Sequence, residues 1–164
     1  MEEDLLLERA RESAFRFLAV RARSRQELRV KLKEKGFGSH VVDRALDYLL
    51  EQGYLDDASF ARQWARNLAA NRLLGDRRIG MSLREKGIPA ELIEEAIAGA
   101  REEISEREAI GKLIAKKGNC RKVNTLKELR RLERRLAGRG FSPGLVFDIL
   151  ETAGEESLYN DESG

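Results

Sequence analysis

The sequence has very few of the side chains on which enzymes and secreted proteins depend. It contains one cysteine, one histidine and two prolines among 164 residues. A single cysteine, Cys120, permits no disulfide within the chain and fits a reducing compartment, so we expect a cytoplasmic protein. No apolar run approaches the roughly 20 residues of a membrane span, and the charged N-terminus is unlike a signal peptide. We therefore expect no membrane partner.

A catalytic or metal site would need several chemical groups in a defined pattern, and we find none. His40 lies at a predicted helix start beside polar residues and is interpreted as a solvated surface residue. Cys120 lies among cations but has no catalytic partner in the sequence. Asp56 and Asp57 lack the alternating spacing of a calcium loop and are interpreted as helix caps. We expect no enzyme activity, no metal, no cofactor and no small-molecule substrate.

What the chain does have is a pattern that occurs three times around three glycines. Gly87 lies 51 residues after Gly36, and Gly140 lies 53 residues after Gly87. At eight and four residues before each glycine, and at five, six, nine and ten residues after it, every residue is apolar. These spacings place each set on one face of a helix. Each unit is therefore predicted to hold two amphipathic helices joined at a glycine corner.

The three glycines are predicted to end helices. A helix commonly stops in a left-handed residue, which only glycine adopts without strain. A cation precedes each glycine, where the helix dipole favours it, and an apolar residue follows: the triplets are Lys35-Gly36-Phe37, Lys86-Gly87-Ile88 and Arg139-Gly140-Phe141. Ser24 with Glu27, and Thr125 with Glu128, have the spacing of capping boxes and are predicted to start two of the helices before these corners.

A further amphipathic helix precedes each pair, so the fold class is predicted to be all-α. We expect three tandem three-helix repeats that form an elongated, curved helical array. The repeats are predicted at residues 1–53, 54–100 and 101–153. The acidic tail, residues 154–164, is expected to be disordered because it is polar and charged.

The formal net charge is only +2, but the charges are unevenly distributed. Segment 21–35 carries seven basic and two acidic residues, and segment 112–139 carries eleven basic and two acidic residues. So many like charges would repel one another and cost stability unless a polyanion or an acidic partner offset them. For any single lysine or arginine, an ordinary solvated helix face is the alternative. The candidate partner-binding or DNA-binding residues are Arg25, Arg29, Lys33, Arg77, Arg78, Lys116, Lys117, Arg121, Lys122, Lys127, Arg130, Arg131, Arg134 and Arg135.

Two helices joined at a glycine corner also outline a helix-turn-helix motif. In that motif the helix after the turn enters the major groove of DNA. Here the helices after the turn carry acids such as Asp43 and Asp47, which would meet the phosphates with the wrong sign. The cations lie on the helix before the turn, which favours contact with a DNA backbone or an acidic protein groove over base reading.

Several motifs, taken together and in order, closely resemble the RecX family. They are Ser24-Arg25-Gln26-Glu27-Leu28 with Leu32 and Lys35-Gly36-Phe37, Gly53-Tyr54-Leu55-Asp56-Asp57 with Phe60-Ala61, Arg77-Arg78-Ile79 with Leu83 and Lys86-Gly87-Ile88, and Arg139-Gly140-Phe141. The resemblance covers about residues 9–150 and does not extend to the acidic tail.

The resemblance implies a regulator, mainly an inhibitor, of the RecA recombinase. Proteins of that family are tandem three-helix repeats that lie in the groove of the RecA filament on DNA and suppress its ATPase, strand-exchange and coprotease activities. A chain that spans adjacent protomers would bind the assembled filament better than free subunits. We expect it to act as a monomer.

Two alternatives stay open from the residues themselves. One is a nonspecific binder of single-stranded or duplex DNA that competes with the recombinase for its substrate. The other is a helical scaffold for an unrelated acidic partner. The salt dependence of binding to bare DNA separates the first alternative from filament binding, because phosphate contacts release counterions.

Overall fold

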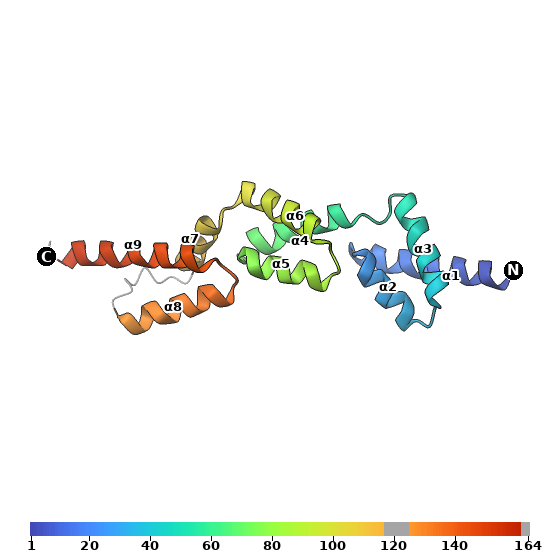
Figure 1. Cartoon of the computed structure of the whole chain (residues 1–164), viewed down its shortest axis with the longest axis horizontal. Helices are drawn as coiled ribbons and strands as arrows, with labels where there is room; N and C mark the ends of the chain where they lie inside the picture. The colour runs from blue at the N-terminus through green and yellow to red at the C-terminus, as the bar shows by residue number, and fades with distance from the viewer. Residues whose placement is uncertain (117–124, 162–164) are drawn as a thin grey trace. The chain divides into compact units, whose positions relative to one another are not determined.

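The computed structural model describes residues 1–116 and 125–161, with side chains up to residue 152. Within these ranges the chain forms helices and no strand, which confirms the predicted all-α class (Figure 1). The helices are α1 (Glu2–Val20), α2 (Arg25–Glu34), α3 (Ser39–Glu51), α4 (Asp57–Ala70), α5 (Asp76–Glu85), α6 (Ala90–Glu103), α7 (Glu106–Lys116), α8 (Leu126–Gly138) and α9 (Pro143–Asp161).

The three glycine corners have the same backbone conformation. Gly36, Gly87 and Gly140 have φ angles of 93°, 74° and 89°, all in the left-handed region. At each corner the glycine N–H donates to the carbonyl three residues earlier, and the next N–H donates to the carbonyl five residues earlier. These bonds satisfy carbonyls that the end of a helix would otherwise leave without partners. The repeat seen in the sequence is therefore a repeat of backbone structure at these corners.

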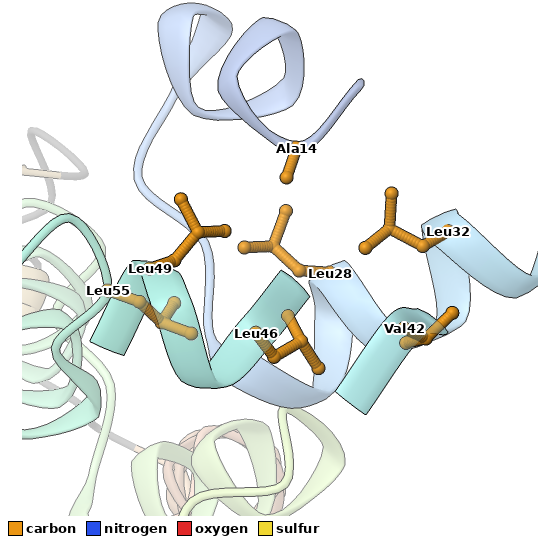
Figure 2. Close-up of a cluster of buried hydrophobic side chains, with 7 residues drawn as sticks. All are labelled: Ala14, Leu28, Leu32, Val42, Leu46, Leu49 and Leu55. Atoms are coloured by element: carbon orange, nitrogen blue, oxygen red, sulfur yellow. The ribbon is translucent and has the colours of Figure 1, made fainter. Parts of the chain in front are cut away.

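The chain divides into two compact units, and the first consists of residues 1–64 and 83–96. In it, α1, α2 and α3 pack against one another (Figure 1). Figure 2 shows the buried cluster that these helices share, which consists of Ala14, Leu28, Leu32, Val42, Leu46, Leu49 and Leu55. Burying one leucine of this kind contributes roughly 1.5–3 kcal/mol. The apolar positions predicted around Gly36 are all buried.

The second unit consists of residues 65–82 and the described residues after 96. In it, α8 packs against α9 (Figure 1). Leu136, Val146 and Phe141, the apolar residue that follows the corner glycine, are buried. The remaining apolar positions predicted around Gly140 are half-buried: Leu132, Leu145, Ile149 and Leu150.

Helix α9 is longer than expected. It continues to Asp161, so residues 154–161, which we expected to be disordered, belong to a helix. No proline follows Pro143, and Ala153, Glu155, Glu156 and Leu158 favour helix. Gly154 disfavours it by only about 1 kcal/mol. Disorder was predicted from composition alone. The segment contains no residue that would stop a helix, and this was not taken into account.

The glycine corners differ in what surrounds them, and this difference can be tested. A Cβ at Gly140 would lie 2.4 Å from the backbone nitrogen of Arg78, whereas one at Gly36 would meet nothing within 4 Å. Gly36→Ala should lower the free energy of unfolding by about 1–2 kcal/mol, through its left-handed backbone alone. Gly140→Ala should cost more, because the backbone of α5 must also move. Urea unfolding followed by circular dichroism measures both values, and equal losses would contradict the packing at Gly140.

Candidate partner-binding surface

In the first unit, the start of α2 is bound to the corner that ends α5. Ser24, the N-cap of α2, is fully buried, and its Oγ donates to the carbonyl of Lys86 at 2.6 Å. The same Oγ accepts from the N–H of Glu27 at 3.1 Å, which confirms the predicted capping box. We call this contact between α2 and the Gly87 corner the first joint.

Glu27 balances the charges of the first joint. Its carboxylate accepts hydrogen bonds from Arg21 and from Lys86, each at 2.7 Å. Burial by itself raises the pKa of Glu27, but these hydrogen bonds and one from the Ser24 N–H outweigh it and lower the pKa to about 2. The same two cations lie over the ring of Trp64, at 5.8 and 4.7 Å from its centroid. An acid between two cations therefore holds this joint together.

Two members of the predicted basic row on α2 are paired with the chain's own acids. Arg25 lies 2.8 Å from Asp47, and Arg29 lies 3.0 Å from Asp43. Both acids belong to α3 and are exposed, as we expected, but they pair with α2. Lys33 is exposed and forms no ion pair within the described ranges. The positive charge that α2 offers to a partner is therefore smaller than the sequence predicted.

The same kind of contact recurs in the second unit, between the start of α5 and the corner after α8. The N–H of Gly75 donates to the carbonyl of Arg139 at 2.9 Å, and the N–H of Arg77 donates to the carbonyl of Gly140 at 3.2 Å. A Cβ on Gly75 would lie 2.2 Å from the backbone of Gly140, so this approach requires glycine. We call this contact the second joint.

Arg139 occupies the second joint without an acidic partner. Its Nε donates to the carbonyl of Leu73 at 3.3 Å, and its Nη2 donates to the carbonyl of Arg72. Leu73 is held at a φ of 53°, a left-handed conformation that leucine rarely adopts. Burial lowers the pKa of the Arg139 guanidinium, and the nearby charges of Arg135 and Arg72 lower it further.

Helix α8 carries the largest exposed group of predicted binding residues. Four of them are exposed and the fifth, Arg135, is half-buried; the exposed ones are Lys127, Arg130, Arg131 and Arg134. In the part of the chain that the structure describes, none of the five forms an ion pair. Leu136, on the opposite face, is buried. Folding thus uses the apolar face of α8 and leaves its cations to solvent or to a partner.

The structure places the other candidates as follows. Arg77 and Arg78 are exposed at the start of α5, in the second joint, and Lys116 is exposed at the end of α7. Lys117, Arg121 and Lys122, together with Cys120, lie outside the described residues. The candidates predicted from the sequence did not include Arg72 and Arg139, two cations of the second joint. A signal for Arg139 was present, because it precedes a corner glycine as Lys86 does.

Among the described residues, no group of histidine, cysteine, aspartate and glutamate side chains could hold a metal ion. None of the described helices combines the length and the apolar character needed to cross a membrane.

Known proteins resemble this chain over most of its length. Residues 10–49 match the first three-helix domain of RecX, and residues 56–97 match the second. Regulatory protein RecX of Mycolicibacterium smegmatis is 35% identical over 148 residues, which are 87% of this chain and 78% of that protein. Regulatory protein RecX of Amycolatopsis mediterranei is 33% identical over 159 residues, which are 93% and 90% of the two chains.

Solved structures show the same fold. The crystal structure of RecX from Lactobacillus salivarius superposes with a TM-score of 0.76 at 20% identity, over 92% of this chain and 96% of that one. A second crystal structure, of regulatory protein RecX, gives a TM-score of 0.79 at 24% identity, over 92% and 74% of the two chains.

The charge balance of the first joint predicts how stability depends on pH. The pKa of Glu27 is lowered from 4.5 to about 2 in the folded chain, so its ionised form stabilises the fold above about pH 4.5, and this contribution is lost as the pH falls toward 2. Glu27→Gln should therefore lower the free energy of unfolding at neutral pH by about 1–3 kcal/mol. The gap between wild type and variant should narrow below pH 4.5.

Unfolding in urea, followed by the fluorescence of Trp64, measures this gap, because Trp64 is the single tryptophan and lies in the joint. Asp43→Asn is the matched control, since it removes an exposed ion pair, with Arg29, that contributes about 0.2–1 kcal/mol. A gap for Glu27→Gln that stays constant from neutral pH to pH 3 would show that the charge of Glu27 does not hold the joint.

Proposed function

Because this chain belongs to the RecX family of regulatory proteins, we propose that it binds the RecA filament on DNA and inhibits the recombinase. It acts by binding, as a monomer and without a cofactor, and it suppresses the ATPase, strand-exchange and coprotease activities of the filament. The identity of the partner comes from the family resemblance of the sequence. The single observation in the structure that supports a binding role is the exposed row of cations on α8.

The charges on α8 exceed what folding requires. Residues three and four apart on a helix are neighbours, so Lys127, Arg131 and Arg135 form one row, and Arg130 and Arg134 form another. Like charges at this spacing destabilise a helix by about 0.2–0.5 kcal/mol per pair. Any polar residue would keep these positions in solvent. Binding to a negatively charged partner would explain why these positions are cations, which folding does not.

A filament suits such a chain better than a free subunit does. Glycine corners of the same backbone geometry recur along the chain, as protomers recur along a filament. If one chain contacts two neighbouring protomers, the second contact forms at a high effective concentration, and the complex with the filament is tighter than that with a single protomer. Bound in this way, the chain inhibits by holding neighbouring protomers in one arrangement.

A nonspecific DNA-binding protein that competes with the recombinase is the second candidate function. The observation that favours it is the same arginine row, because guanidinium groups bind phosphate as readily as carboxylate. In that case binding to bare DNA would account for all of the inhibition.

Reversing the charge on α8 tests the proposed role of this surface. The triple variant Arg130→Glu, Arg131→Glu and Arg134→Glu should bind RecA filaments on the order of tenfold more weakly, or worse, since attraction becomes repulsion. Its inhibition of the filament's ATPase should fall accordingly. Helical content by circular dichroism should not change, because all three side chains are exposed and glutamate favours helix.

A matched control reverses three exposed arginines of the first unit: Arg9→Glu, Arg16→Glu and Arg62→Glu. This variant has the same net charge and should inhibit like the wild type. Inhibition that survives in the α8 variant would remove the basic surface of α8 from the mechanism. If both variants lost inhibition equally, the basic surface of α8 would contribute only through the net charge of the chain.

A further inference from the structure

In both joints the start of a helix binds the carbonyl that precedes a corner glycine, but the charged groups around the two joints differ. Glu27 is the third residue of α2 and binds Lys86, the cation before the corner glycine. The third residue of α5 is Arg78, and the cation before its corner glycine is Arg139. At these two positions the first joint therefore has an acid and a cation, whereas the second joint has two cations.

Five arginines gather at the second joint. Arg72, Arg77 and Arg78 come from the loop before α5 and from its first turn, and Arg135 and Arg139 come from the end of α8. Gly140 lies so close to α5 that an added Cβ would be 2.6 Å from the Cβ of Arg78. Among the described residues none of the five arginines forms an ion pair.

Two acids lie near the start of α5, and each accepts a hydrogen bond from a group other than the five arginines. Asp76, beside Arg77, accepts from Arg101 at 2.6 Å. Glu106 accepts from the backbone N–H of Asp76 at 2.9 Å. Among the described residues, neither of these carboxylates forms an ion pair with any of the five arginines.

The guanidinium of Arg139 is held in place by two backbone carbonyls. Its Nε and Nη2 donate to the carbonyls of Leu73 and Arg72, which fixes the plane of the guanidinium. Its Nη1 donates to no protein group in the described ranges. A guanidinium that is already ordered loses less entropy when it binds an anion, and its planar fork matches the geometry of phosphate oxygens.

We propose that the second joint is a phosphate-binding site that binds the backbone of nucleic acid through Arg72, Arg77, Arg78, Arg135 and Arg139. The first joint also brings the start of a helix to a glycine corner, and there the third residue of the helix is a glutamate, so a contact of this kind does not require an arginine at that position. A linear polyanion fits better than a single acidic side chain. The cations continue from Arg135 to Arg131 and Lys127 at intervals of one helical turn along α8. The site rests on the proposed function only for the source of the nucleic acid, the DNA of the filament.

Phosphate binding would also stabilise the joint itself. Bound phosphates offset the repulsion among the five arginines, so a ligand that binds only the folded chain raises its stability. A single-stranded oligonucleotide should therefore raise the melting temperature of the wild-type chain.

Arg78→Glu is the sharpest test, because it gives the second joint the acid that the first joint has. The variant should fold at least as stably as the wild type, since an acid in the first turn of α5 suits the helix dipole and can pair with Arg139. Its affinity for a fluorescent single-stranded oligonucleotide should fall by on the order of tenfold, and the slope of log K against log salt should fall by about 1. At the same concentration, the oligonucleotide should raise its melting temperature less than that of the wild type.

Arg62→Glu is the matched control, an exposed arginine of α4 with the same change of charge. Its affinity and salt slope should stay within about twofold of the wild type, as for a charge outside the site.

Wild-type affinity and slope in Arg78→Glu would overturn the proposal. So would a variant that keeps its oligonucleotide affinity but loses binding to free RecA, because the joint would then bind an acidic protein surface. The oligonucleotide assay contains no recombinase, so a wild-type chain that fails to inhibit RecA would overturn the proposed function and leave this result standing.

Discussion

A contact between the start of one helix and the glycine corner that ends another determines where the cations before two of the corner glycines lie. The end of a helix leaves carbonyls without intrahelical partners. In the first unit the Ser24 hydroxyl donates to such a carbonyl, that of Lys86, and in the second unit the Gly75 and Arg77 N–H groups donate to those of Arg139 and Gly140. Positive helix starts thereby meet negative helix ends, which the helix dipoles favour. The cation before each of these corner glycines is consequently brought to a joint.

Contacts between a helix start and a glycine corner can therefore carry different chemistry. In the first joint Lys86 and Arg21 share Glu27 through hydrogen bonds that are exposed for Arg21 and half-buried for Lys86. In the second joint Arg139 binds only backbone carbonyls, and the surrounding side chains are cations. In the first joint an acid pairs with the cations, whereas the second joint leaves a surface of arginines without acidic partners among the described residues, to which we propose that an anionic partner binds. Helix α8 extends that surface, since its apolar residues are used in packing and its arginines are not.

Local signals in the sequence were sufficient for the corners and for most of the helices, but not for the end of α9. Each corner depends on a left-handed residue, which glycine supplies, and the capping box at Ser24 needs only residues three apart. The pairing of Arg25 with Asp47 and of Arg29 with Asp43 could not be predicted, because it depends on how α3 is rotated against α2. The cluster at the second joint depends likewise on a contact between segments more than 60 residues apart, such as Arg139 with Leu73. Sequence spacing describes one helix at a time and does not show which helices meet.

The central claim is that the chain recognises the assembled recombinase filament rather than its separate components. Affinity should be measured at one salt concentration for RecA filaments on DNA, for free RecA and for the bare DNA. We expect filaments to bind on the order of tenfold more tightly, or better, than either component, because only the filament offers neighbouring protomers and DNA together. Equal affinity for bare DNA and for the filament would contradict filament recognition.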